Sequence, residues 1–185
     1  FEEFVSHIVR KWRKEKKIIL ENAGLGEISN REQGDKSEEY VKRKIERLIP
    51  RYKAFLTNGS QTPADIFSFS RRNVYWHIML IQVKSSRNKD DIYSLTDNDK
   101  KIFTQFSNFV KNEIPKFDLF NGYSEKPIVI SRGYVSVFSN ETSNGIRHKV
   151  IDSNLLDITS LNSLKLDLPI IRVTLIKTHT SISRV

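Results

Sequence analysis

Hydrophobic residues recur at helical spacing in three stretches of the chain. The first stretch, residues 1–23, ends before Gly24. The second runs from Ser37 to Arg51, and serine is a residue type that caps helix N-termini well. The third stretch, Asp97–Ile114, ends before a proline, which cannot continue a helix. The pattern therefore predicts three amphipathic helices.

Runs of apolar residues between and after these helices predict β-strands. The longest run, Val74–Lys84, is almost continuously apolar, which is typical of a central strand covered on both faces. Shorter strands are expected at Ala64–Phe69, Lys126–Ser131, Tyr134–Phe138 and Ile170–Ile176, with a turn at Arg132–Gly133. A further strand is expected either in Lys53–Asn58 or in the C-terminal tail.

The order helix, strand, strand, helix, strand predicts an α/β fold in which helices flank a central mixed sheet. We expect a basic amphipathic helix and linker in residues 1–33, a core in 34–138, and an extension packing on the core in 139–185. The first helix carries the cations Arg10, Lys11, Arg13, Lys14, Lys16 and Lys17. They fit either the solvated face of a packing helix or a helix that contacts DNA or forms a dimer arm, and both interpretations stay open.

Composition narrows the classes of partner. The 185 residues include 31 Lys and Arg against 22 Asp and Glu, a net charge of +9, which favours nucleic acid, an anionic membrane surface or an acidic protein as partner.

The absence of cysteine excludes disulfides, thiol catalysis and thiolate zinc sites, and it fits an intracellular location. No apolar run is long enough to span a membrane. Because the first residue is Phe1, we expect the natural start to lie upstream.

Three polar residues at the ends of the two predicted core strands are the main candidates for chemistry. Asp65 stands at the start of the shorter strand, whereas Gln82 and Lys84 end the longer one and point to the same face because they are two residues apart. Lys84 closes an apolar run, where an unpaired charge is costly. Mg²⁺ prefers oxygen ligands, so Asp65, the Gln82 side-chain oxygen and the Val83 backbone carbonyl predict a metal site.

A glutamate on the second helix adds a further oxygen donor. At 100° per residue, Glu38 lies about 60° or less from Val41 and Ile45, so it points along the apolar stripe toward the sheet. Glu39 is rotated toward Lys42 and water. Two interpretations of Glu38 are open: a ligand of a metal ion or its water, or a first-turn glutamate that favours the helix dipole.

Together these residues resemble the motifs of the PD-(D/E)xK nuclease superfamily, and they are most similar to those of archaeal Holliday-junction resolvases. Pro63-Ala64-Asp65 matches the first motif and Gln82-Val83-Lys84 the second, and the resolvase pattern also includes Gly34, Glu38 and Ser60. The resemblance covers about Gly34–Phe138 and implies a restriction-endonuclease-like αβββαβ core. The small size, basic charge and lack of cysteine also resemble a nuclease of an archaeal spindle-shaped virus.

The resemblance implies a metal-dependent endonuclease that hydrolyses DNA phosphodiester bonds, with duplex or branched DNA as substrate. Mg²⁺, or Mn²⁺ in its place, is expected to bind Glu38, Asp65, Gln82 and the Val83 carbonyl, while Lys84 orients the attacking water. Expected contacts to the DNA backbone are Ser60, Gln61, Arg71, Arg72, Arg87 and Lys89. Because DNA presents two strands, we expect a two-fold homodimer.

Two departures from the family pattern keep other functions open. Ala64 separates the proline from Asp65, and Gln82 replaces the second acid, which removes one negative charge from the metal site. QxK variants occur in the superfamily among Mrr-like restriction enzymes. The alternatives are an inactive nucleic-acid-binding module on the same fold, or a basic interaction protein in which Asp65 and Lys84 only form an ion pair. The histidines lack metal-ligand spacing. His77 points away from Gln82 by strand alternation and is expected in the core or on a sheet face.

Overall fold

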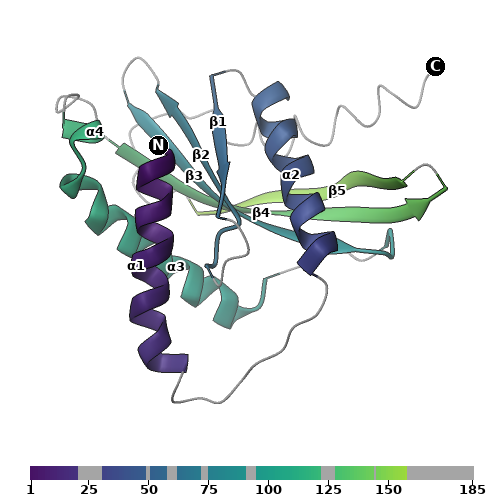
Figure 1. Ribbon diagram of the computed structural model, residues 1–185, viewed down its shortest axis with the longest axis horizontal. Helices are drawn as coiled ribbons and strands as arrows, with labels where there is room; N and C mark the ends of the chain where they lie inside the picture. Colours follow the sequence, from purple (N-terminus) through teal and green to yellow (C-terminus); the bar gives the residue numbers. More distant parts are fainter. Residues whose placement is uncertain are drawn as a thin grey trace.

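The computed structural model describes residues 1–20, 31–48, 51–57, 62–71, 75–90, 95–121, 128–143 and 145–157 (Figure 1). Its helices are α1 (Glu2–Leu20), α2 (Arg31–Leu48), α3 (Asp97–Glu113) and the single turn α4 (Asp118–Asn121), with a 3₁₀ turn at Ile114–Lys116. Its strands are β1 (Lys53–Leu56), β2 (Ile66–Arg71), β3 (Trp76–Ser86), β4 (Ile128–Thr142) and β5 (Gly145–Asp157). None of the described helices combines the length and apolar character that a membrane span requires.

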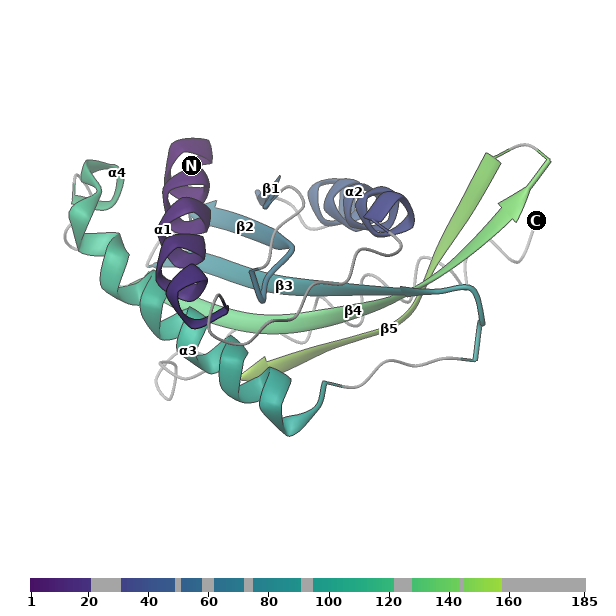
Figure 2. The same cartoon turned by 60° about the horizontal axis from the view of Figure 1, so that its bottom comes forward.

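The described strands form one mixed sheet in the order β1-β2-β3-β4-β5. Neighbouring strands run antiparallel except β3 and β4, which are parallel because the chain returns through α3 between them. Helices cover the sheet on both sides, with α2 and α3 on opposite faces (Figure 2). The prediction of an α/β fold with a central mixed sheet between helices is therefore confirmed.

Alternation along β3 divides the core into two clusters. On one face, Ile78 and Leu80 pack with apolar residues of α1 and α3, which include Phe4, Ile8, Trp12, Phe103 and Phe106. On the other face, Met79, Ile81 and Val83 pack with Val41 and Ile45 of α2. This double coverage explains why the strand is apolar almost throughout. His77 faces the α2 side, is fully buried, and lies 2.5 Å from the Tyr52 hydroxyl and 2.7 Å from the Ser131 hydroxyl. Its predicted place in the core is confirmed.

The structure corrects the predicted C-terminal half of the core. The prediction of two strands around a turn at Arg132–Gly133 is wrong, because β4 passes through both residues and only its pairing with β5 shifts register there. Arg132 suggested a turn because it is charged, but in the structure it is buried and donates to the Thr104 hydroxyl on α3. The predicted core boundary at residue 138 falls inside β4, which pairs along its length with β5.

Other boundaries differ less. The helix predicted from Ser37 begins six residues earlier, at Arg31, so the end of the predicted linker, residues 31–33, is helical. Of the two places where a further strand was expected, residues 53–58 contain β1. The strand predicted at 170–176 lies outside the described residues.

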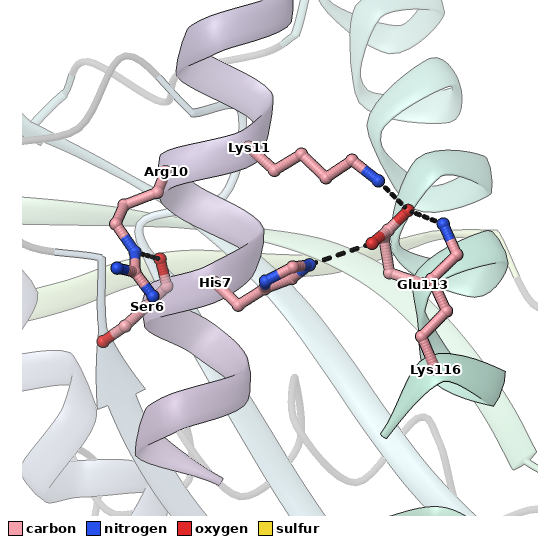
Figure 3. Close-up of polar contacts among 6 residues, drawn as sticks. All are labelled: Ser6, His7, Arg10, Lys11, Glu113 and Lys116. Atoms are coloured by element: carbon pink, nitrogen blue, oxygen red, sulfur yellow. Dashed lines mark hydrogen bonds and ion pairs between the residues drawn. The ribbon is translucent and has the colours of Figure 1, made fainter.

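The N-terminal helix is part of the core and is anchored by a buried carboxylate. Its apolar face, including Phe4, Ile8 and Trp12, is buried against α3 and the sheet. Glu113 of α3 has a side chain only 3% exposed; its carboxylate accepts from Lys11 Nζ at 2.7 Å and contacts the His7 ring at 2.9 Å (Figure 3). Burial raises the pKa of Glu113, but hydrogen bonds from Lys11, Lys116 and His7 outweigh it and bring the pKa to about 2. The first helix is thus a packing helix.

We expect Glu113→Gln to lower the free energy of unfolding by about 1 to 3 kcal/mol at pH 7, because charge-assisted hydrogen bonds are lost and two lysines lose their counter-ion. Since the folded-state pKa lies below the ordinary value, this stabilisation is present above about pH 4.5 and is lost as pH falls toward 2. Urea denaturation at pH 7 and pH 3 measures both effects. Glu39→Gln, at a partly exposed pair with Arg43, is the matched control and should change little. Equal losses in the two variants would contradict the prediction.

Candidate functional site

The pairing of β2 with β3 ends where the candidate site begins. The last pair is Ile66 with Ile81, whereas β3 continues to Ser86 beside β4. Just before β2, the Asp65 amide donates to the Ile81 carbonyl at 2.8 Å, and the Thr57 amide donates to the Asp65 carbonyl at 3.0 Å. The backbone of Asp65 is therefore clamped between the end of β1 and β3, at the point where β2 and β3 separate.

Two buried threonines support this turn. The Thr62 hydroxyl donates to the Ala64 carbonyl at 2.8 Å, and the Thr57 hydroxyl donates to the Ala64 and Asp65 carbonyls at 3.1 and 3.2 Å. Sequence reasoning did not select either threonine, because threonine in a turn is common and only the folded contacts show what it holds. Together they fix the backbone that carries the Asp65 side chain.

The Asp65 carboxylate is bound to the middle of the Gln82-Val83-Lys84 motif. Its Oδ2 accepts a hydrogen bond of 2.7 Å from the Val83 backbone N–H, which on this strand would otherwise face a further residue of β2. The N–H and C=O of one residue in a β-strand point to the same side, so the Val83 carbonyl also points to the side of β3 where β2 has ended. An acidic side chain and a backbone carbonyl are thus brought to one strand edge.

Gln82 and Lys84 project together from the face opposite Val83. Val83 packs in the α2 cluster, so alternation places its two neighbours on the α3 side of the sheet, where both are half-buried. In the parallel pairing with β4, Gln82 lies opposite Tyr134 and Lys84 opposite Ser136. Lys84 is near enough to Asp65 for its positive charge to act on the carboxyl group.

The electrostatics of Asp65 depart strongly from those of a surface carboxyl. Burial raises its pKa from the ordinary value of 3.8 to about 6, even though the Val83 N–H and the Lys84 charge both lower it. The free-energy cost of desolvating the Asp65 carboxylate is therefore larger than the stabilisation that the Val83 N–H and the Lys84 charge provide. A carboxylate that the protein leaves incompletely stabilised in its charged form is typical of a functional site, because a further cation would complete it.

The structure places Glu38 on the helix that covers the other face. It is half-buried in the middle of α2, the eighth of its 18 residues, so the interpretation of Glu38 as a first-turn glutamate is wrong. Val41 and Ile45 of the same helix pack on the Val83 side of the sheet. The adjacent Ser37 is fully buried and lies 3.0 Å from the Ser139 hydroxyl of β4. The structure therefore brings Asp65, Val83 and Lys84 together, whereas Glu38 approaches from the opposite face to Gln82 and Lys84.

The donor set fits a hard divalent cation with few protein ligands. Among the described residues, no group of three His, Asp or Glu lies close enough to hold a metal ion. The predicted site does not need one, since Mg²⁺ is commonly held by one or two carboxylates and keeps several waters. Asp65 could supply one carboxylate, and the Val83 carbonyl and the Gln82 amide could supply neutral oxygens. This set of ligands has little negative charge, so we expect it to bind Mg²⁺ weakly when no DNA phosphate is present.

The predicted DNA contacts divide into three groups. Arg87 and Lys89 are exposed just beyond the end of β3, at the same end of the strand as Lys84. Arg71 is exposed at the far end of β2, about 20 Å from Asp65 along the strand, because β2 leads away from the site. The remaining predictions, Ser60, Gln61 and Arg72, lie outside the described residues.

Comparisons with family models, with curated proteins and with solved structures find no match to this chain. Its function is therefore inferred from the geometry of its own site.

Proposed function

We propose that this protein is a divalent-metal-dependent DNA endonuclease of the PD-(D/E)xK type. The observation that carries the proposal is the 2.7 Å hydrogen bond between the Asp65 carboxylate and the Val83 N–H, which joins the two motifs at the separation of β2 and β3. It holds a desolvated carboxylate beside the lysine of the second motif. A carboxylate, two neutral oxygens and a lysine in this arrangement suit phosphodiester hydrolysis.

Each residue of the site has a distinct role in the proposed reaction. Asp65, Gln82 and the Val83 carbonyl would hold the cation, and Glu38 would bind one of its waters from the α2 side. The bound cation would polarise the phosphate and lower the pKa of the attacking water. Lys84 would orient that water and neutralise charge that develops on the phosphate oxygens. The Val83 N–H keeps the Asp65 carboxylate in one orientation, so that little reorganisation is needed when substrate binds.

DNA is the proposed substrate because cations surround this end of β3. The chain has a net charge of +9, and Arg87 and Lys89 extend the positive charge of Lys84 beyond the strand end. Arginine and lysine at such positions bind phosphates without reading base sequence. We propose that two copies form a two-fold dimer, since cutting both strands of a duplex or both arms of a junction needs two sites.

We expect the protein to cut a labelled four-way junction or plain duplex in the presence of Mg²⁺ or Mn²⁺, and to leave both intact in the presence of chelator. Gel electrophoresis of the products measures cleavage, and comparison of the two substrates shows which DNA structure is preferred. Asp65→Ala protein purified in the same way controls for contaminating nuclease. Intact DNA with every metal would contradict the proposed activity.

A second candidate function is an inactive DNA-binding module on the same fold. It is favoured by the neutral Gln82 at the place of the second acid, and by the lack of a third acidic or histidine ligand among the described residues. This alternative predicts DNA binding of equal strength with metal and with chelator, and no cleavage in either condition. The same substrates therefore distinguish the two candidates.

A further inference from the structure

The hairpin of β4 and β5 carries cations on the same face of the sheet as the candidate site. Val150 packs in the α2 cluster, and His148 contacts Ser37 and Ser139 on that side. Alternation therefore directs Arg147 and Lys149 to the opposite face, which is the face of Gln82 and Lys84. Both residues are exposed.

The strand register places these cations diagonally beyond Lys84, two strands away. Lys84 lies opposite Ser136, and two residues further along β4 Phe138 lies opposite Lys149. Two residues further still, Asn140 lies opposite Arg147. With strands about 4.8 Å apart and about 3.4 Å per residue, Lys149 is roughly 12 Å and Arg147 roughly 17 Å from Lys84 between Cα atoms.

The end of the hairpin projects away from the helices. In Figures 1 and 2 the paired ends of β4 and β5 extend beyond α2 and beyond the end of β3. Arg87 and Lys89 follow the end of β3, so four exposed cations and Lys84 belong to this end of the sheet, with Asp90 as an exposed acid next to them. A basic strip of this kind complements a polyanion rather than an apolar partner.

We infer that Arg147 and Lys149 form a second contact to the DNA backbone, which holds the duplex to one side of the phosphate that is cut. The inference rests on the proposed function, because it takes Lys84 as the position of that phosphate. One strand of B-DNA rises about 3.4 Å per nucleotide, so separations of roughly 12 and 17 Å correspond to about three to five nucleotides. The hairpin thus sets how far the substrate must extend beyond the scissile bond, and it binds phosphates in any sequence.

The test compares DNA binding by Arg147→Gln/Lys149→Gln with binding by Arg47→Gln/Lys111→Gln. The control removes the same charge from exposed positions on α2 and α3. Fluorescence anisotropy with labelled duplex DNA, in chelator and over a range of salt, measures affinity without cleavage. We expect the hairpin variant to bind on the order of 10-fold more weakly at about 0.1 M salt, with a salt slope smaller by about 2, while the control matches wild type. Arg147→Lys should bind like wild type because it keeps the charge.

Every outcome of this binding test either supports or overturns the inference. A hairpin variant that binds like the control, or a control that loses as much affinity as the hairpin variant, overturns it while the proposed nuclease activity stands. Loss of affinity for duplex RNA of the same sequence, without loss for DNA, also overturns it. Wild-type protein that binds no DNA overturns the proposed function together with the inference. Equal thermal unfolding of all variants shows that the hairpin substitutions act on binding and not on folding.

Discussion

Lys84→Ala and Asp65→Ala are each expected to slow metal-dependent DNA cleavage by at least about 100-fold, while DNA affinity in chelator stays near the wild-type value. Lys84→Ala removes the cation that would orient water and neutralise charge at the phosphate. Asp65→Ala removes the carboxylate of the site and leaves the buried Val83 N–H without its acceptor. Both substitutions remove groups that act on the scissile phosphate, so they slow cleavage. Most of the DNA-binding energy is expected from contacts to phosphates outside the site, so affinity is retained.

Single-turnover cleavage with excess protein separates this effect from substrate binding. Lys111→Ala, an exposed lysine on α3, is the control for loss of one positive charge. If Lys84→Ala cuts as fast as Lys111→Ala, the role assigned to Lys84 is wrong. Gln82→Glu restores the acid of the family pattern and should lower the Mg²⁺ concentration needed for half-maximal cleavage. A higher requirement for Mg²⁺ would show that Gln82 is not a ligand.

Asp65→Asn is expected to stabilise the folded protein in chelator by up to about 3 kcal/mol at pH 7. The pKa of Asp65 rises from 3.8 to about 6 on folding, and each pKa unit corresponds to about 1.4 kcal/mol. Asparagine carries no charge that needs hydration, and its side-chain oxygen still accepts from the Val83 N–H. Stability would therefore be gained by the same substitution that removes activity, as is common for functional residues.

The pH dependence of this effect has a defined sign. The folded state binds the Asp65 proton more tightly than the unfolded state does. The contribution of Asp65 to the free energy of unfolding of the wild type is therefore fully present below about pH 4 and is lost as pH rises through 6. The difference between Asp65→Asn and wild type should thus be small at pH 4 and reach its full size above pH 6. Thermal or urea denaturation at several pH values measures it, with exposed Asp90→Asn as the control. A destabilised Asp65→Asn protein at pH 7 would contradict the prediction.

The local pattern of apolar residues was sufficient to identify elements that are buried in a regular way. The apolar run ending at Lys84 identified β3, because a strand buried on both faces has no polar face to confuse the pattern. The stripe of Phe103, Phe106 and Val110 identified α3, which packs with one face on the sheet. The short strand β1, with four residues of mixed exposure, was one of two alternatives because such a segment has almost no periodicity.

Elements that depend on distant partners were missed. Arg132 suggested a turn because a charged residue beside glycine is common there, yet Thr104 on α3 binds its guanidinium inside a continuous strand. No pattern in the sequence reveals that partner, because it lies 28 residues away along the chain. The strand β5 lies in the C-terminal segment, one of the two places where a further strand was expected, but the sequence did not give its bounds. Its alternation is interrupted by a register shift at Ser136–Val137 of β4.

The pattern of residues along the chain is enough to assign the class of fold and the candidate pair of motifs, because residue spacing within one strand dictates which side chains share a face. It also determined the basic character of the chain. Three relations are visible only in the folded protein: the Asp65 carboxylate binds the Val83 N–H, Glu38 lies on the helix covering the opposite face, and Arg147 and Lys149 share the face of Lys84. Those relations depend on strand order and register between segments far apart in the chain, which long-range packing sets and local spacing does not encode.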